Sequence, residues 1–215
     1  MQLSKDISLK KYNTFGIDVQ AKYFYSIETI EQLNTLLKSL INQPKFILGG
    51  GSNLLLTKDI NAHVIYINNK GIRVISENET HVNVCCAAGE EWHDFVLWTL
   101  NEGYGGIENL SLIPGKTGTA PIQNIGAYGV ELKDIFVSCE AIERETLKTK
   151  TFTKEDCNFG YRDSIFKNDF KDKYVITSIT LKLTKSNHTL NYSYGAIKQT
   201  LDNRNIITPT INDIS

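Results

Sequence analysis

The sequence predicts an α+β protein made of two units, and three observations lead to that class. Helical and strand-like patterns alternate over residues 1–67. From residue 68 onward, the clearest patterns have the period of two that is typical of β-strands. A segment rich in glycine and proline interrupts the second unit at 103–129, and it must form a long loop rather than a regular helix.

The first unit, residues 1–67, is predicted to be a small α/β arrangement. Apolar residues recur on one face of 26–41, with acidic residues in the first turns, which predicts a helix. Short strands are predicted at 46–48, 54–56 and 64–67. Alternating helix and strand is typical of an α/β unit.

The second unit, residues 68–200, is predicted to be of α+β type. A short helix is predicted at 91–100, where apolar residues share a face and Gly103 follows as a stop. Strands are predicted at 80–88, 134–144, 147–152 and 174–184, with 134–144 and 147–152 as an antiparallel pair.

Bulk composition excludes several classes of function. The formal net charge of the 215 residues is -1, so the chain lacks the excess of positive charge that would indicate nucleic-acid binding. No apolar run approaches the ~20 residues of a membrane span, and the N-terminus lacks the apolar region of a secretory signal. We therefore expect a cytoplasmic protein with no nucleic-acid or membrane partner, and separately we expect a monomer.

Cysteine and histidine spacing gives no sign of a disulfide framework or a metal site. The four cysteines form no C-x-x-C pair, and neighbouring Cys85 and Cys86 would point to opposite faces of a strand. The four histidines lie far apart without metal-ligand spacing. We therefore expect the four cysteines to be reduced thiols and the protein to bind no metal.

The glycine-rich segment is the most informative part of the chain. Residues 103–129 hold seven of the fifteen glycines, yet apolar residues such as Leu112, Ile122 and Ile125 are interleaved throughout. A solvated linker would carry Ser, Lys and Glu instead. We therefore favour a packed loop that holds a ligand over a floppy connection.

A second glycine cluster follows the strand predicted at 46–48. Gly49, Gly50 and Gly51 expose consecutive N–H groups with no Cβ in the way, a geometry that can cradle a phosphate or pyrophosphate. Ser52 and Asn53 add side-chain donors. The alternative is a glycine-rich hairpin turn, although three glycines exceed what such a turn needs.

Gly115-Lys116-Thr117 looks like the end of a Walker A loop. The earlier glycine of that motif would fall at position 110, which is Leu110, and no buried strand leads into the segment. A nucleotide-triphosphatase is therefore rejected.

Arg162 is the candidate catalytic cation. It lies beside Gly160 and Tyr161, which could hold its guanidinium in one pose, and a fixed guanidinium stabilises a carboxylate or an enolate. Taken alone, the segment 159–164 reads more readily as a surface turn with a local salt bridge.

Together these segments resemble the UDP-N-acetylenolpyruvoylglucosamine reductases of peptidoglycan synthesis. Long matches are specific to a family, and these occur in family order over nearly the whole chain. The matching pieces are NTFG at 13–16, GGGSN at 49–53, AGE at 88–90 with Trp92, residues 106–115, PIQNIGAYG at 121–129 and FGYRDSIF at 159–166.

The resemblance implies the two-domain FAD-binding fold of these reductases, with FAD between the two units and its pyrophosphate on the glycine loops. It implies that NADPH reduces the flavin, which then gives hydride to the enolpyruvyl double bond of a UDP-sugar to form UDP-N-acetylmuramate for the cell wall. Arg162 matches the arginine that stabilises the enolate, and Tyr128, Tyr161 and Tyr194 match substrate-site tyrosines. The implied cofactor-binding residues are Gly49, Gly50, Gly51, Ser52, Asn53, Pro114, Gly115, Gly118, Pro121, Ile122, Gln123, Asn124, Gly126, Ala127 and Ile176.

The chain departs from the family pattern at its end. The family's proton donor, a serine or cysteine in a Gly-Ser-Phe-Phe-Lys-Asn-like segment, has no match, and neither has its acidic partner. Because the sequence stops at Ser215, the resemblance implies that residues 201–215 are the truncated start of a substrate domain. The chain then looks like a reductase without its C-terminal substrate domain and with impaired activity. The alternative is a non-catalytic FAD-binding fragment. Another flavin oxidase of the same architecture is disfavoured by PIQNIGAYG with Arg162, and no His or Cys is placed to tether a flavin.

Overall fold

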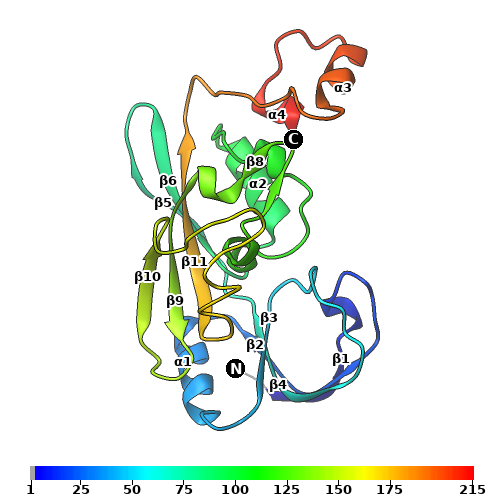
Figure 1. Ribbon diagram of the computed structural model, residues 1–215, viewed down its shortest axis with the longest axis vertical. Helices are drawn as coiled ribbons and strands as arrows, with labels where there is room; N and C mark the ends of the chain where they lie inside the picture. The colour runs from blue at the N-terminus through cyan, green and yellow to red at the C-terminus, as the bar shows by residue number, and fades with distance from the viewer. Residues whose placement is uncertain (1–2) are drawn as a thin grey trace.

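The computed structural model describes residues 3–215, and two β-sheets organise it (Figure 1). The first sheet has the order β1-β2-β4-β3, in which β4 pairs in parallel with β2 and with β3, while β1 is antiparallel to β2. Helix α1 connects β2 to β3 and covers one face. The elements are β1 (Leu3–Ser8), β2 (Gln20–Ile27), α1 (Ile30–Ser39), β3 (Lys45–Leu48) and β4 (Ile60–Ile67).

Helix α1 is shorter than the predicted 26–41. Ser26 and Ile27 belong to β2, where they pair with the end of β4. These two residues, predicted to be helical, therefore form the end of a strand. The hydroxyl of Thr29 accepts a hydrogen bond from the N–H of Gln32 at 3.2 Å and caps the helix. The face carrying Leu33, Leu36 and Leu37 is buried.

The second sheet is antiparallel throughout, in the order β10-β9-β11-β6-β5. It confirms the predicted strands of the second unit and the predicted hairpin of β9 and β10. Helix α2 also lies where it was predicted. The elements are β5 (Ile72–Glu77), β6 (His81–Ala87), α2 (Trp92–Asn101), β9 (Phe136–Glu143), β10 (Thr149–Thr153) and β11 (Tyr174–Thr184).

The strand predicted at 54–56 is wrong, because those residues follow the glycine turn without pairing to any strand. Strands β1, β2 and β5 were not predicted. Short strands β7 (Gly126–Ala127) and β8 (Val130–Glu131) form a separate hairpin, and α3 (Ile197–Asn203) and α4 (Ile211–Ile214) lie at the far end of the molecule (Figure 1). Among residues 3–215, no helix has the length and apolar character needed to cross a bilayer.

The glycine-rich segment 103–129 is a packed loop, as predicted. Leu110, Ala120 and Ile125 are buried in the core of the second sheet. Two stretches form short 3₁₀ helices, Glu108–Leu110 and Thr117–Gln123, and none forms an α-helix.

A shared apolar cluster joins the two sheets. It contains α1, the ends of β2 and β4, and also Ile142 of β9 and Val175 of β11. The two sheets are therefore packed around common side chains, and the space beside this cluster holds the site described next.

Candidate functional site

The two glycine-rich loops meet at the junction between the sheets. A Cβ built on Gly50 would lie 2.6 Å from the Cα of Gly115, so only glycine lets the backbones approach this closely. The Ser52 hydroxyl donates to the carbonyl of Pro114 at 3.1 Å, and the Asn53 amide donates to the side chain of Gln123 at 2.7 Å. Two hydrogen bonds therefore hold the loops in register.

The first glycine loop presents backbone donors that the protein leaves unused. No backbone N–H group of residues 50–53 donates a hydrogen bond within the described part of the chain. Because partly buried N–H groups need acceptors, this row of donors suits an anion. The pattern supports the anion cradle predicted from the sequence.

An N-terminal segment fixes the back of this loop. Gly51 has a φ of +65°, and a Cβ there would lie 2.1 Å from the carbonyl oxygen of Tyr12. The Asn13 amide donates to the carbonyls of Leu9 and Ile17, and its oxygen accepts from the N–H of Ile17. The match of residues 13–16 to the reductase family thus has a local structural reason.

Two adjoining cavities open beside the loops. The smaller, of about 200 Å³, lies between the glycine loops, and the larger, of about 470 Å³, lies between the two sheets. Ile47, Gly49, Thr119 and Ile122 line both, so the cavities form one elongated cleft.

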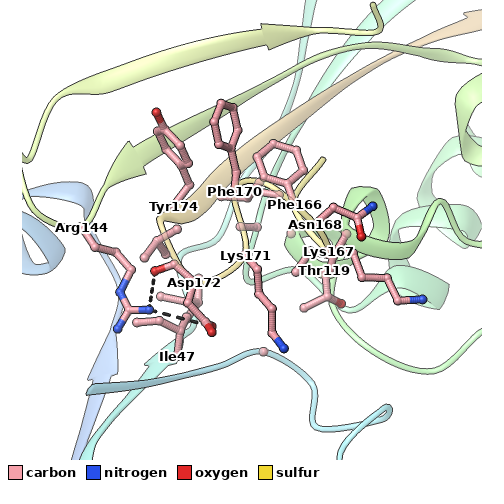
Figure 2. A pocket seen from close by; sticks show the side chains of 17 residues that line it. Ile47, Thr119, Arg144, Phe166, Lys167, Asn168, Phe170, Lys171, Asp172 and Tyr174 are labelled. Carbon is pink, nitrogen blue, oxygen red and sulfur yellow. Dashed lines mark hydrogen bonds and ion pairs between the residues drawn. The ribbon is translucent and has the colours of Figure 1, made fainter. Parts of the chain in front are cut away.

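The segment 166–174 forms one wall of the larger cavity (Figure 2). The rings of Phe166, Phe170 and Tyr174 pack edge-on against Phe152 of β10, with centroid distances of 5.0, 5.7 and 5.0 Å. Figure 2 shows these rings on one side of the segment and the Lys171 side chain on the other. The aromatic anchor therefore fixes the wall and leaves polar groups toward the opening.

Arg144 bridges the two sheets at this cavity. Its guanidinium donates to the carbonyl of Asp172 at 2.7 Å and to the carbonyl of Lys45, at the start of β3, at 3.4 Å. The Asp172 carboxylate lies 4.0 Å away (Figure 2). The side chain is mostly buried, so it joins the elements that form opposite walls.

Three hydrogen bonds fasten the turn that carries Arg162 to the second glycine-rich loop. The Asn124 amide donates to the carbonyl of Gly160 at 2.9 Å, and the Ser164 hydroxyl donates to the carbonyl of Ile122 at 2.7 Å. The third runs from the Arg162 guanidinium to the carbonyl of Gly126. The segment is a turn, as the simpler interpretation expected, but its arginine bonds to the loop, and no ion pair of Arg162 occurs in the described chain.

The three candidate substrate tyrosines are exposed. Tyr128, whose φ is +50°, makes an edge-to-face contact with Tyr194 at a centroid distance of 6.3 Å. Tyr161 is 83% exposed next to Arg162. Arg162 and the three tyrosines line neither cavity.

The predicted cofactor residues occupy three kinds of position. Gly50 and Gly115 form the contact between the loops. Pro121, Asn124, Gly126 and Ala127 belong to the loop that supports the cleft, and Asn124 is fully buried. Those that line the cleft are Gly49, Gly51, Ser52, Asn53, Pro114, Gly118, Ile122, Gln123 and Ile176.

Sequence reasoning missed Arg144, Lys171 and Asp172 of the larger cavity and Lys116 of the smaller one. The first three are charged residues at strand ends and turns, where solvent exposure is the usual outcome and no local pattern signals a cavity. Lys116 was noticed only as part of the rejected Walker motif.

Comparison with known proteins shows that the chain is similar to FAD-binding proteins. The sequence profile of the FAD binding domain family matches residues 21–146. UDP-N-acetylenolpyruvoylglucosamine reductase from Flavobacterium johnsoniae is 58% identical over all 215 residues, and the Pseudomonas putida reductase is 45% identical. The chain spans 64% and 63% of the lengths of these two relatives.

Solved structures agree on the fold. The UDP-N-acetylenolpyruvylglucosamine reductase of Thermus caldophilus has a TM-score of 0.66 and 25% identity, covering 85% of this chain and 62% of its own. A cholesterol oxidase from Brevibacterium sterolicum has a TM-score of 0.59 at 16% identity, covering 85% of this chain and 38% of its own. That likeness shows a shared fold alone.

Proposed function

The chain belongs to the FAD binding domain family, and from this premise we propose that it serves the FAD-dependent, NADPH-using reduction of an enolpyruvyl UDP-sugar to UDP-N-acetylmuramate. The observation that carries the proposal is the cradle of unused N–H groups beside an elongated cleft, in a chain 58% identical to a named reductase. FAD as the cofactor and the α+β fold, both expected from the sequence, are confirmed by the family match.

The residues of the cleft fit FAD. The N–H groups of 50–53, with the side chains of Ser52 and Asn53, offer donors to the diphosphate. Because FAD is long and carries two ring systems, it suits a cleft of two adjoining cavities. Ile47, Ile122 and Val175 give the larger cavity an apolar lining suited to a planar ring.

Bound FAD supplies hydride transfer between NADPH and the enolpyruvyl double bond. The task of this chain's own residues is to stabilise the charge that develops when hydride adds to that bond. The electron pair moves toward the substrate carboxylate, and the Arg162 guanidinium, held by Gly126 and by the anchored turn, would stabilise the resulting enolate. Protonation at the adjacent carbon completes the reduction, and we assign that proton to no residue of this chain.

The tyrosines would contact the UDP-sugar. Tyr128 and Tyr194 pair on the surface beside the Arg162 turn, and Gly129 brings the two segments close, since a Cβ there would lie 3.1 Å from the Asn191 amide. An exposed aromatic pair offers a stacking surface for a nucleotide base or a sugar.

FAD titration of a Gly50→Ala variant tests the proposal. The added methyl would press on the backbone of Gly115 and close the cradle, so FAD affinity should fall at least about tenfold, the equivalent of about 1.4 kcal/mol. Gly103→Ala is the control: its φ of +74° makes the substitution strain the backbone, but the added Cβ would meet nothing within 4 Å and lies outside the cleft, so FAD affinity should not change. Tight FAD binding by Gly50→Ala would contradict the assignment.

NADPH oxidation with and without the enolpyruvyl substrate separates the two functions left open by the sequence. Oxidation that depends on the substrate indicates a reductase. FAD binding without such dependence indicates that these 215 residues form an FAD-binding part that does not turn over alone.

A further inference from the structure

Lys116 is a charged side chain in the interior, and the proposed function has given it no role. The residue is 2% exposed. Its ammonium donates to the Asn68 side chain and to the carbonyl of Gly89, both at 3.0 Å, and lies 4.3 Å from the centroid of the Tyr66 ring. It therefore sits where the end of β4, the end of β6 and the second glycine-rich loop come together.

The protein compensates this buried charge only in part. The nearest carboxylate is that of Glu91, 3.6 Å from the Lys116 ammonium, and its side chain is 47% exposed to solvent. Lys70 brings a second positive charge to the same place, since its ammonium donates to the same Gly89 carbonyl at 2.6 Å and pairs with Glu90 at 3.3 Å. The hydrogen bonds of this ammonium are satisfied, but a buried cation whose ion-pair partner is half-exposed to solvent remains costly, and a further anion nearby would stabilise it.

The backbone of Lys116 borders the proposed diphosphate cradle. Its nitrogen lies 3.1 Å from the Cβ built on Gly50, and the residue lines the smaller cavity. Lys116 and Glu91 form an antiparallel bridge in which the N–H of Trp92 bonds to the carbonyl of Gly115 and the N–H of Thr117 to that of Glu90. In such a bridge the bridged residue's own N–H points away from the partner strand, and the Lys116 nitrogen lies beside Gly50.

We propose that Lys116 is the buried cation that complements the diphosphate of bound FAD, and that FAD binding is coupled to protonation of its ammonium. The inference rests on the proposed function and deepens it. Its geometric basis is one residue that lines the smaller cavity, lies beside Gly50 with its backbone nitrogen, and carries a buried ammonium whose carboxylate partner is half-exposed.

The sign of the coupling follows from the environment of Lys116. Burial lowers the pKa of its ammonium to about 8, while Glu91 and Glu90 oppose that shift and Lys70 adds to it. Tyr66 does not titrate in this range, because burial raises the pKa of its phenol to about 12. An added diphosphate favours the charged ammonium and raises the pKa of Lys116, so binding above pH 8 takes up a proton and affinity falls as pH rises.

Calorimetric titration of the chain with FAD at pH 8.5, in two buffers of different ionisation enthalpy, measures this proton uptake directly. We expect net uptake of protons by the unmodified chain and an affinity about tenfold weaker at pH 9.5 than at pH 7. Lys116→Met should bind FAD more weakly at pH 7 and show neither uptake nor pH dependence.

Lys70→Met is the matched control, since it removes an ammonium that bonds to the same carbonyl but is half-exposed. It should keep the proton uptake. FAD binding by the unmodified chain without proton uptake would overturn the inference and leave the proposed function standing, and this measurement does not depend on whether Lys116→Met folds. Absence of any FAD binding would overturn the proposed function and the inference with it.

Discussion

At the residue scale, strained backbone marks the position of the candidate catalytic arginine. Arg162 has a φ of +54°, in the left-handed region that residues other than glycine seldom adopt. Such a conformation persists only where surrounding contacts impose it, and here the turn is bonded to the loop on both sides of Arg162, through Gly160 and Ser164. The position of the guanidinium beside Gly126 is therefore fixed by the bonded backbone of the turn as well as by the guanidinium's own hydrogen bond.

If Arg162 stabilises an enolate, its effect should be confined to one half-reaction. In a chimaeric chain that continues into the last part of the Flavobacterium johnsoniae relative, Arg162→Ala should slow oxidation of the reduced flavin by the enolpyruvyl substrate by roughly 10²-fold. Flavin reduction by NADPH should change much less, because no enolate forms in that step. Stopped-flow absorbance separates the two rates.

Arg162→Lys serves as the second variant, and it should restore only part of the rate, since a point charge lacks the planar fork that matches a carboxylate. Equal slowing of both half-reactions by Arg162→Ala would mean that the residue only holds the turn.

At the element scale, local pattern predicted the elements whose burial is periodic. Helix α2 buries one regular face, and β11 buries every second residue from Val175 to Leu183 as well as part of its other face; both were predicted from their periodicity. Strand β5 is exposed at nearly every residue, and β1 at the edge of its sheet has little buried surface, so neither has an apolar period to detect. Residues 54–56 show the converse, an apolar run that pairs with no strand and leaves Leu55 69% exposed.

The residues of the candidate site also differ in whether a local sequence pattern could predict them. The glycine loops were predictable, because consecutive glycines have a local backbone meaning. Arg144 and Asp172 were not, because the pairing of β9 with β11 brings them together, and only the packing of the two sheets adds the contact of Arg144 with Lys45. Lys116 was hidden for a related reason, since a lysine in a loop is normally solvated and only tertiary structure buries it.

The turn at 159–164 should depend on the hydroxyl of Ser164. That side chain is buried, donates to the carbonyl of Ile122 and accepts from the N–H of Phe166 at 3.2 Å. Ser164→Ala leaves the buried N–H of Phe166 and the partly buried carbonyl of Ile122 without this partner and should lower the free energy of unfolding by about 1–3 kcal/mol. Urea denaturation measures the loss as a lower midpoint concentration, provided that the slope of unfolding free energy against urea is unchanged.

Ser39→Ala is the matched control for this prediction. Ser39 also donates to a backbone carbonyl, that of Leu36 at 2.8 Å, but it is an exposed residue at the end of α1. A Ser164→Ala variant no less stable than Ser39→Ala would show that the hydroxyl does not anchor the turn.

At the scale of the whole molecule, the cleft exists because two sheets share a core on one side and remain apart on the other. Val175 and Ile142 of the second sheet enter the cluster around α1, and Val175 also lines the larger cavity. Apolar packing therefore sets the relative position of the sheets. Arg144 adds a polar link across the opening, from β3 to the wall at Asp172.

Removing this link should loosen the cleft even in the absence of cofactor. Arg144→Met keeps the aliphatic stem but loses the hydrogen bonds to Asp172 and Lys45, so the free energy of unfolding should fall by about 1–3 kcal/mol. Because the wall is then less fixed, FAD should dissociate about tenfold faster, measured by stopped-flow displacement. Arg73→Met is the control, since Arg73 is an exposed residue of β5 on the far edge of the second sheet. Dissociation at the unmodified rate in Arg144→Met would show that the apolar cluster alone sets the width of the cleft.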